Sequence, residues 1–169
     1  EVENTLSSIK PDIIIHGAAM TNVDQCELNQ EACFDSNVNA TAYLIKAAEA
    51  SNAHFIFVST DFIFSGEEGP LDENAIPAPV NYYGETKLIG EELVMKSKTK
   101  WAIARTAEFF GLNKELIKRA DSSTFTQPAK RPLKTGFIIK KAQEQLGFEP
   151  KTFRTAIGIL AKQIILARA

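Results

Sequence analysis

Short apolar runs alternate with longer helical patterns along the first two thirds of the chain. Apolar and β-branched residues predominate at positions 12–16, 54–58 and 101–104. Such runs are typical of strands that are buried on both faces of a parallel sheet. Between them, positions 32–50 and 83–98 carry apolar residues at helical spacing. The order of strand, helix, strand, helix and strand predicts βαβ units, and therefore an α/β fold with right-handed crossovers.

The segment before the second helix and the apolar faces of both helices can also be predicted. Segment 65–81, between the second strand and the second helix, is rich in proline, glycine and acidic residues. We expect it to be a long irregular loop, and loops of this length in compact domains are often functional. The expected apolar faces are Phe34, Val38, Tyr43, Leu44, Ala47 and Ala48 for the first helix, and Leu88, Ile89, Leu93 and Val94 for the second.

The last third of the chain is less regular. Residues 107–120 have a helical pattern, and residues 121–136 are polar enough to be a connector. A short helix over 137–146 is expected to end at Gly147, a residue suited to the left-handed conformation of a helix C-terminus. Thr152 is a suitable N-cap for a final helix.

Composition narrows the class of protein. Hydrophobic residues make up 44% of the 169 residues and charged residues 24%, with a net charge of −2. These values exclude a disordered chain, and no basic field indicates a nucleic acid or an anionic membrane as partner. No stretch approaches the roughly 18 apolar residues of a membrane span. Cys26 and Cys33 have no zinc-site spacing, so we expect a cytoplasmic protein with reduced thiols and no metal site.

Two candidate chemical features follow predicted strands, where open α/β sheets bind ligands. Small residues at 17–19 follow the first strand and would let a ligand approach the backbone, although a tight turn is the simpler interpretation. Ser59 and Thr60 end the next strand. A hydroxyl there can hold a substrate carbonyl oxygen, or it can simply cap a turn.

Tyr83 and Lys87 form the third feature. Their spacing of four places them on one face of a helix. A free phenol with a pKa near 10 is a poor acid at neutral pH, and a nearby ammonium lowers that pKa. The pair could then give a proton to a ketone that becomes an alcohol. Taken alone, the spacing is also typical of an aromatic residue and a solvated lysine on an ordinary helix.

The order of these features resembles the extended short-chain dehydrogenase/reductase superfamily. Within it, the chain is similar to the dTDP-4-dehydrorhamnose reductase (RmlD-like) group. The segment from Thr60 to Gly66 is the most specific part of the similarity. The matching segments are Pro-Asp-Ile-Ile-Ile-His-Gly-Ala-Ala at 11–19, Asn-Val-Asp at 22–24, Asn-Val at 37–38, Ser-Thr-Asp-Phe-Ile-Phe-Ser-Gly at 59–66 and Asn-Tyr-Tyr-Gly-Glu-Thr-Lys-Leu at 81–88.

This resemblance implies a Rossmann-like, doubly wound parallel sheet and NADPH or NADH as cofactor. It implies that Tyr83 protonates the C4 oxygen of a keto-sugar nucleotide and that Thr60 hydrogen-bonds the same oxygen. Lys87 would lower the pKa of Tyr83 and hold the nicotinamide ribose. The implied cofactor-binding residues are Gly17, Ala18, Ala19, Ser59, Tyr83 and Lys87, and the implied substrate-binding residues are Thr21, Thr60, Asp61 and Phe62.

Other positions have a supporting or packing role by the same resemblance. Asn37 matches a position that supports the site from its helix, whereas His16 is expected to pack at the strand end. Cys26 and Cys33 match no functional position.

The resemblance also implies two domains. Residues 1–106 would be part of an NAD(P)-binding Rossmann domain that carries the catalytic motif, and residues 107–169 part of a small C-terminal substrate-binding domain. Segments 129–132 and 146–157 resemble the Arg-Pro segment and the last helix of that second domain.

Two family elements have no counterpart in this chain. One is the first strand with its Gly-x-x-Gly-x-x-Gly loop, and the other is a segment between the two domains. Only Gly66 and Gly69 have the spacing of that loop, and they flank Glu67 and Glu68, which are unsuited to a pyrophosphate. We therefore expect an incomplete sheet in a chain that is part of a longer protein or a truncated variant.

Reduction of a 4-keto-6-deoxy sugar nucleotide is the leading hypothesis, with a sugar nucleotide as partner and a homodimer left open. The same group resembles the non-catalytic regulatory subunit of methionine adenosyltransferase, so a nucleotide-binding regulatory role is an alternative. Sugar-nucleotide epimerases and dehydratases also use Tyr-x-x-x-Lys, but segment 60–64 fits the reductases better. A fragment without activity of its own is a further hypothesis.

Overall fold

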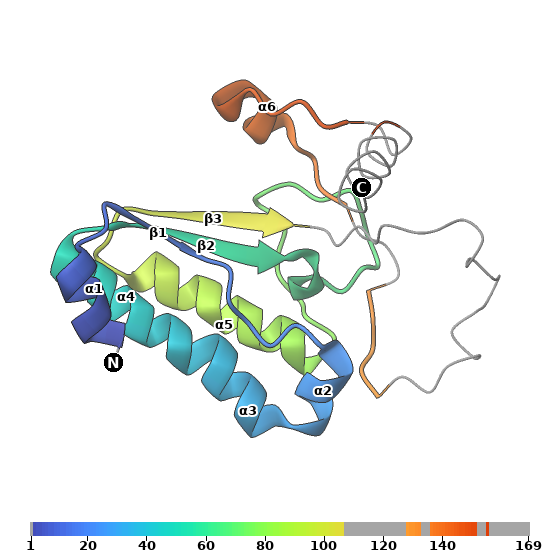
Figure 1. The fold of residues 1–169 in the computed structure, drawn as a ribbon. Coiled ribbons are helices and arrows are strands. Elements are labelled where there is room, and N and C mark those ends of the chain that lie inside the picture. The colour runs from blue at the N-terminus through green and yellow to red at the C-terminus, as the bar shows by residue number, and fades with distance from the viewer. Residues whose placement is uncertain (1, 107–127, 133–135, 152–154, 156–169) are drawn as a thin grey trace, which may run out of the picture. The chain divides into compact units, whose positions relative to one another are not determined.

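The computed structural model describes residues 2–106, 128–132, 136–151 and 155. They fall into two compact units, one that contains the described residues up to 137 and one that contains those from 138 onward. The predicted domain division at residue 106 stays a prediction. The elements in chain order are α1 (Val2–Ile9), β1 (Ile13–His16), α2 (Val23–Leu28), α3 (Gln30–Phe34), the π-helix η1 (Asp35–Asn39), α4 (Ala40–Ser51), β2 (His54–Thr60), the 3₁₀-helix η2 (Asp61–Ile63), α5 (Tyr82–Lys96), β3 (Trp101–Thr106) and α6 (Lys140–Leu146) (Figure 1).

The first unit is built on a three-stranded parallel sheet in the order β1-β2-β3 (Figure 1). Ile14 pairs with Phe55 on one side of β2, and Phe57 pairs with Ile103 on the other side. Helices connect β1 to β2 and β2 to β3, as parallel strands require. The predicted α/β class and all three predicted strands are therefore confirmed, with β2 and β3 each two residues longer than expected.

Helices α4 and α5 cover one face of this sheet and form the core with it (Figure 1). Removal of these apolar side chains from water is what holds the helical layer on the strands. Helix α1 packs against α4. The buried core residues are Ile14, Ile45, Ala48, Ala53, Phe55, Phe57 and Val94, and Leu6, Leu44, Leu93 and Ile103 pack against them.

The prediction that the strands are buried on both faces is wrong for β1 and for β3, in which no residue is buried and Trp101 is 42% exposed. Ile14 and His16 are buried on the helical side, whereas Ile13 is 55% exposed and Ile15 is 69% exposed. Successive side chains of a strand point to opposite faces, and α4 and α5 cover only one of them. An uninterrupted apolar run therefore did not show that the second face is covered.

The helix predicted over 32–50 is present but is not continuous. The π-helix η1 lies between α3 and α4, and its wider turn shifts which side chains face the sheet. Two members of the predicted apolar face are consequently exposed, Tyr43 to 59% and Phe34 to 36%. The residues buried along this stretch are Cys33, Asn37, Val38, Thr41, Ile45, Ala47 and Ala48.

The remaining predictions for this unit concern α5 and the loop before it. Helix α5 begins one residue before the predicted start, and Val94 is buried as expected, while Ile89 is 36% exposed. The structure describes all of segment 65–81, and it is irregular as predicted, with a single bridge from Leu71 to Phe137.

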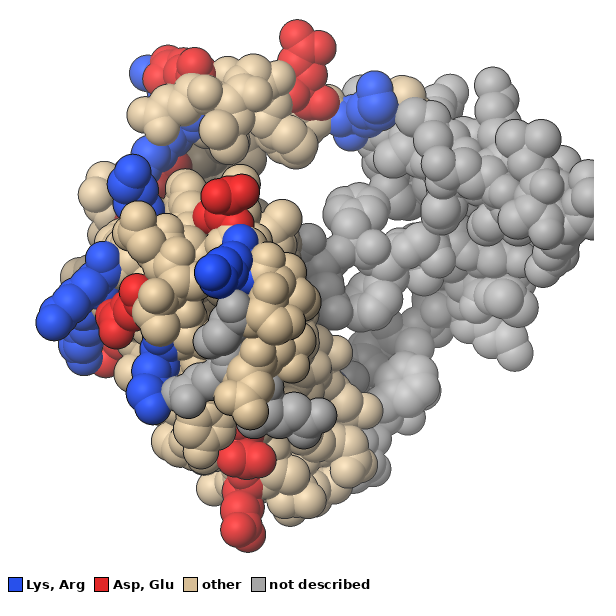
Figure 2. Space-filling view, turned by 60° about the vertical axis from the view of Figure 1, so that its left-hand side comes forward, with Lys and Arg blue, Asp and Glu red and all other residues tan. Residues whose placement is uncertain are grey.

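In the second unit, α6 begins at Lys140, three residues after the predicted start at 137, and ends as predicted at Gly147, which has φ of 63°. The backbone N–H of Gly147 bonds to the carbonyls of Ala142 and Gln143. The helices predicted over 107–120 and from Thr152 lie outside the described residues. Acidic and basic side chains are interspersed on the face drawn in Figure 2. No helix within the described part of the chain is long and apolar enough to cross a membrane.

Candidate active site

The loop that leaves β1 lies beside the end of β2, because His16 pairs with Phe57. Gly17 and Ala18 are exposed in this loop, and Ala19 is half-buried. A Cβ added to Gly17 would lie 3.9 Å from Val58 Cγ2, an ordinary contact. The small side chains therefore leave the backbone accessible at this edge of the sheet, as the sequence predicted.

Strand β2 ends in two hydroxyl residues with different surroundings. Thr60 Oγ1 donates to Asp61 Oδ1 (3.1 Å) and accepts from the backbone N–H of Phe62 (3.3 Å), so it caps η2. Ser59 is 2% exposed, and its hydroxyl has no hydrogen-bond partner among the described residues. A buried hydroxyl without a partner is destabilising, so Ser59 is an unusual feature at this strand end.

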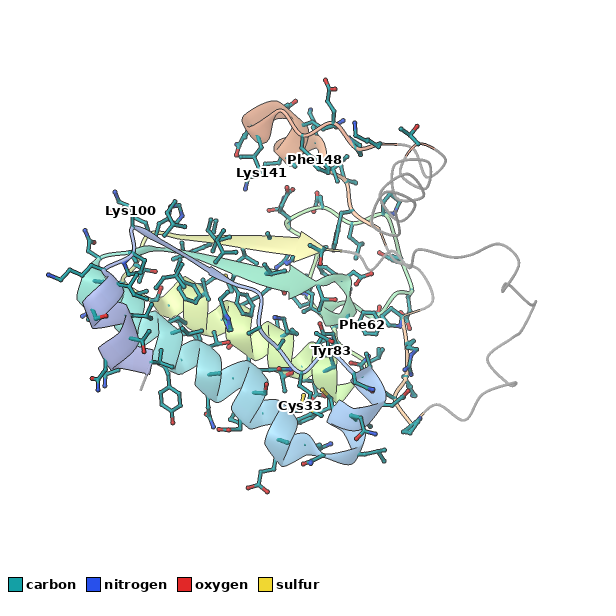
Figure 3. All side chains as sticks on the ribbon, in the orientation of Figure 1. Cys33, Phe62, Tyr83, Lys100, Lys141 and Phe148 are labelled. Atoms are coloured by element: carbon teal, nitrogen blue, oxygen red, sulfur yellow. The ribbon has the colours of Figure 1, made fainter. Side chains whose placement is uncertain are left out.

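Helix α5 begins directly against η2. Asn81 caps it, with Oδ1 accepting from the backbone N–H of Gly84 at 2.8 Å. A Cβ on Gly84 would collide with the backbone carbonyl oxygen of Phe62, so only glycine permits this approach. The rings of Phe62 and Tyr83 meet edge to face with centroids 5.8 Å apart (Figure 3). The start of α5 thus brings Tyr83 to the segment that follows Thr60.

Tyr83 is 8% exposed and belongs to a small apolar cluster with the two cysteines. Burial raises the pKa of the Cys26 thiol, whose Sγ donates to the carbonyl of Met20 at 3.3 Å. Both cysteines are free and buried in the cluster with Tyr83, which fits a packing role, and Figure 3 labels Cys33 near this tyrosine. The half-buried side chains around this cluster are Met20, Val23, Phe62 and Tyr82.

Asn37 in η1 connects three segments around the tyrosine. Its Oδ1 accepts from the N–H of Met20 (2.7 Å), and its Nδ2 donates to the Met20 carbonyl (3.1 Å). Nδ2 also donates to Thr86 Oγ1 (3.0 Å), which in turn donates to the carbonyl of Tyr83 (2.8 Å). Asn37 therefore ties the loop after β1 to α5, a placement that fits the supporting role expected from the resemblance. π-Helical turns are frequent at functional sites.

Lys87 lies one turn after Tyr83 on α5 and is 4% exposed. Its Nζ donates to the carbonyl of Val58 (2.8 Å) and lies 4.1 Å from the centroid of the Phe57 ring. Burial lowers the pKa of Lys87 to about 8, although the charge of Glu91 acts in the opposite direction. The structure thus places a buried amine, with a pKa near neutral pH, one helical turn from Tyr83.

His16 is also buried close to this lysine. Burial, and secondly the charge of Lys87, lower the pKa of His16 to about 4. Its Nε2 lies 2.9 Å from Thr41 Oγ1. A neutral, hydrogen-bonded imidazole at the strand end agrees with the packing role that we expected.

Sequence reasoning missed the ion pair one turn beyond Lys87. Arg105 Nε and Nη2 donate to Glu91 Oε1 (2.9 Å) and Oε2 (2.7 Å), and the Glu91 side chain is fully buried. The pair connects α5 to the end of β3 and places a carboxylate near Lys87. The sequence carried no local signal for this pair, because Glu91 and Arg105 are 14 positions apart on different elements. The capping role of Asn81 was also missed, although an asparagine just before a helix is a common N-cap.

The expected substrate-binding residues do not all occupy equivalent places. Asp61 and Phe62 contact Thr60 and Tyr83, respectively, so they belong to the same cluster. Thr21 is exposed on the loop after β1.

A separate hollow of about 330 Å³ lies in the irregular loop, and its lining contains neither Thr60 nor Tyr83. Glu67 and Glu68 in that lining make it unsuited to an anionic diphosphate. Within the described part of the chain, no three His, Cys, Asp or Glu residues gather as metal ligands would. The lining residues of the hollow are Phe64, Ser65, Glu67, Glu68, Leu71, Asn74, Ala75 and Ile76.

Several known proteins are similar to this chain. It is 39% identical over 111 residues to the dTDP-4-dehydrorhamnose reductase of Aggregatibacter actinomycetemcomitans, which covers 65% of this chain and 38% of that protein. It is 35% identical over 124 residues to methionine adenosyltransferase 2 subunit beta of Pongo abelii, which covers 73% of this chain and 37% of that protein. The chain therefore spans little more than a third of the length of these relatives.

Solved structures show the same fold. The dTDP-4-dehydrorhamnose reductase of Bacillus anthracis, in complex with NADP, matches with a TM-score of 0.61 and 36% identity over 63% of this chain and 38% of that chain. UDP-glucose 4-epimerase of Brucella ovis, in complex with NAD, matches with a TM-score of 0.57 at 24% identity, over 62% of this chain and 34% of that chain. The second match supports the Rossmann-like fold alone.

The family comparison agrees with the geometry of the site. Residues 1–116 match the model of the RmlD substrate-binding domain. That stretch contains the whole parallel sheet and the helix that carries Tyr83 and Lys87. The chain therefore belongs to the RmlD substrate-binding domain family.

Proposed function

We propose that the protein reduces the keto group of a 4-keto-6-deoxy sugar nucleotide with NADPH or NADH. One observation carries this proposal. Tyr83 and Lys87 are buried one turn apart at the start of α5, against the strand that ends in Thr60. The similarity to dTDP-4-dehydrorhamnose reductases supports the substrate class, because two of them are 39% and 36% identical to this chain over 65% and 63% of its length.

The residues present fit the nicotinamide end of such a cofactor. Gly17 and Ala18 leave accessible backbone beside β2, and the Ser59 hydroxyl, which has no hydrogen-bond partner in the described part of the chain, lies at the end of that strand. Lys87 would hold the ribose hydroxyls through Nζ, which here donates to the Val58 carbonyl. The cofactor, when bound, supplies the hydride that reduces the carbonyl carbon.

The chain's own residues supply the proton and the orientation. Tyr83 donates its phenolic proton to the carbonyl oxygen as the carbon is reduced, and solvent returns the proton to Tyr83 afterwards. The Lys87 ammonium stabilises the phenolate left behind, because an opposite charge favours the ionised form. The Thr60 hydroxyl donates to the same substrate oxygen and so fixes its orientation. This requires Thr60 to exchange its present acceptor, Asp61, for the substrate.

The first prediction tests this assignment. The protein is expected to oxidise NADPH or NADH in the presence of a 4-keto-6-deoxy sugar nucleotide. Tyr83→Phe removes only the hydroxyl and is expected to lower kcat by about 10²- to 10⁴-fold with the fold retained, the usual contribution of a general acid. The decrease in reduced cofactor is measured spectrophotometrically, with circular dichroism as the folding control. Full activity of Tyr83→Phe would refute the mechanism.

A regulatory, nucleotide-binding role is the second candidate, since methionine adenosyltransferase 2 subunit beta proteins are 34–35% identical over 124 residues. The two candidates are separated by measuring turnover and cofactor binding on the same sample. Binding of NADP without turnover, together with co-purification of a methionine adenosyltransferase, would favour the regulatory role. Turnover that depends on Tyr83 would favour the reductase.

A further inference from the structure

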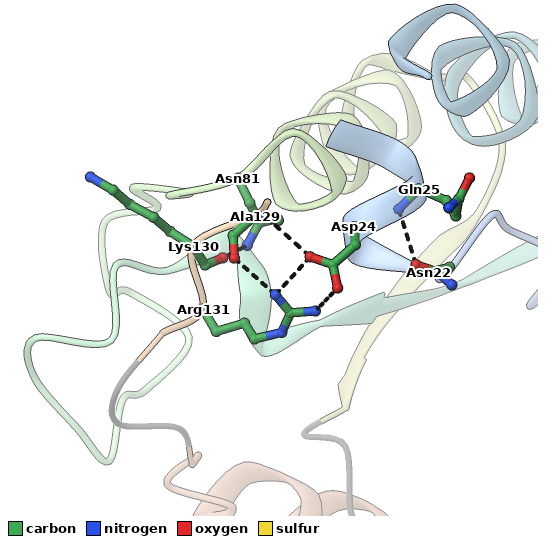
Figure 4. A network of polar contacts seen from close by, with 7 residues as sticks. All are labelled: Asn22, Asp24, Gln25, Asn81, Ala129, Lys130 and Arg131. Carbon is green, nitrogen blue, oxygen red and sulfur yellow. Dashed lines mark hydrogen bonds and ion pairs between the residues drawn. The ribbon is translucent and has the colours of Figure 1, made fainter. Parts of the chain in front are cut away.

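A segment distant in sequence contacts the start of α5, the helix that carries Tyr83 and Lys87. Residues 128–132 belong to the first unit and lie between α2 and the N-terminus of α5 (Figure 4). Arg131 makes a two-pronged ion pair with Asp24 of α2, from Nη1 to Oδ1 (3.0 Å) and from Nη2 to Oδ2 (2.7 Å). The two partners are 107 positions apart in the sequence.

The same carboxylate also shapes the segment itself. The backbone N–H of Ala129 donates to Asp24 Oδ1 (3.2 Å), and Arg131 Nη1 donates to the Ala129 carbonyl (2.8 Å). Ala129 is 2% exposed. Asp24 therefore holds three consecutive residues in one conformation, and it determines where the carbonyl of Lys130 points.

That carbonyl binds the cap of α5. Asn81 Nδ2 donates to the Lys130 carbonyl (2.7 Å), while Asn81 Oδ1 accepts from the Gly84 N–H (2.8 Å) (Figure 4). Because the NH₂ group of Asn81 donates to the Lys130 carbonyl, the oxygen of the same amide faces the first turn of α5. Asn81 is 4% exposed, so water is poorly placed to replace this contact.

Helix α2 supports the first turn of α5 a second time. Glu27 Oε2 accepts from the backbone N–H of Tyr82 (3.0 Å), one of the amides that a helix start leaves without an internal partner. Asp24 and Glu27 are three apart on α2, so one short helix holds both contacts.

We infer that Asp24 and Arg131 are positioning residues that set the place of Tyr83 through Lys130 and Asn81. Neither is a catalytic residue, because each acts through the backbone of residues 128–132 and the cap. The consequence for turnover rests on the proposed function, whereas the effect on the helix start does not.

The primary experiment measures the helix start directly. Asp24→Asn keeps the shape of the side chain but removes its charge. It is expected to accelerate hydrogen exchange of the Gly84 amide about five- to tenfold. This factor corresponds to the free energy that a helix typically loses with its N-cap. The Val94 amide at the far end of α5 is the internal reference and is expected to change little. Lys96→Met is the matched control, since it also removes an ion pair. Its partners are exposed, with the Lys96 side chain at 75% and the Glu92 side chain at 50%.

A second variant separates this route from general stabilisation. Asn81→Ser keeps a good capping oxygen but cannot reach the Lys130 carbonyl. In that background, Asp24→Asn is expected to have no further effect on Gly84 exchange. Arg131→Lys keeps the charge but cannot make both hydrogen bonds of the guanidinium group to Asp24. It is expected to give a Gly84 exchange rate between those of the wild type and Arg131→Met.

The outcomes distinguish the inference from the function on which it builds. Unchanged Gly84 exchange in Asp24→Asn, or equal acceleration at Gly84 and Val94, would overturn the positioning role. Selective acceleration supports it even when the wild type shows no turnover, a result that would count against the reductase alone. Where turnover is present, a lower kcat at an unchanged KM for the cofactor is the expected signature.

Discussion

Lys87 on α5 and His16 at the end of β1 are buried ionisable side chains, and each has defined polar contacts. Lys87 donates to a backbone carbonyl and lies over an aromatic ring, while His16 is neutral beside Thr41. Burial is the main cause of the lowered pKa of both groups. The fold thus accepts two buried ionisable groups with lowered pKa values, and such groups are typical of functional sites.

A prediction for Lys87 follows from the sign of its shift. Its pKa is about 8 in the folded protein and 10.5 ordinarily, so between these pH values only the unfolded chain carries the proton. Relative to Lys87→Met, the wild-type free energy of unfolding should therefore rise with pH across this window, by at most about 1.4 kcal/mol per pH unit. Below pH 8 the difference should be constant. Urea unfolding of both proteins at several pH values measures it, and parallel curves throughout would contradict the assignment.

A matching prediction holds on the acid side. The pKa of His16 is about 4 when folded and 6.5 ordinarily, so the unfolded chain takes up a proton first as the pH falls. Stability should decline from pH 6.5 to pH 4 more steeply in the wild type than in His16→Gln, which cannot titrate. The free energy of unfolding in urea across this range provides the test. An identical decline in the variant would show that other groups are responsible.

At the scale of elements, the close approach of α5 to the sheet depends on two glycines. Gly84 lies against the backbone carbonyl of Phe62, and a Cβ on Gly90 would be 2.7 Å from Cζ of the buried Phe57 ring. Lys87 lies between the two glycines and Tyr83 directly precedes Gly84, so these contacts hold both residues beside β2. The sequence showed a helix here, but its distance from the strand is a packing property.

Alanine at these positions should therefore reverse the usual trend. Alanine in a helix interior is normally about 1 kcal/mol more favourable than glycine. Here Gly84→Ala and Gly90→Ala are each expected to lower the free energy of unfolding by about 1–3 kcal/mol through overpacking. Gly84→Ala should be the more costly, because a backbone carbonyl cannot turn aside as a side chain can. Gly17→Ala is the control, since its Cβ would lie at an ordinary contact distance of 3.9 Å from Val58 Cγ2. The denaturation midpoints of the three variants rank their stabilities.

At the scale of the whole molecule, the first unit is a parallel sheet with α4 and α5 on one face. Neighbouring residues of β1 consequently have opposite surroundings, since Ile14 is 9% exposed and Ile15 is 69% exposed. The hydrophobic contribution of an isoleucine depends on the area that it removes from water. Adjacent, chemically identical residues should therefore differ in their contribution to stability.

This difference can be measured in the chain itself. Ile14→Ala is expected to lower the free energy of unfolding by about 2–4 kcal/mol, because it leaves a cavity in the core. Ile15→Ala should cost less than about 1 kcal/mol, since most of its side chain is already in water. Equal costs in denaturant titrations would mean that the second face of β1 is covered in solution.

Much of the fold and of the site could be predicted because the signals are local. Apolar runs and helical spacing located the three strands and α5, and the order Ser59-Thr60 followed by Tyr83 and Lys87 pointed to the site. The register of the first long helix could not be predicted in this way. The π-helix around Asn37 turns Tyr43 outward and Thr41 inward, because hydrogen bonds to Met20 and Thr86 determine where Asn37 lies.

By itself, the sequence determined the α/β class, the strand order along the chain and the group of residues proposed for catalysis. Each depends on periodicity or on spacings of a few residues, which the chain carries in its local order. Only the tertiary structure decided which face of β1 is covered, how closely α5 approaches β2 and that Arg131 pairs with Asp24. These features depend on contacts between residues distant in sequence, and such contacts exist only once the elements have packed together.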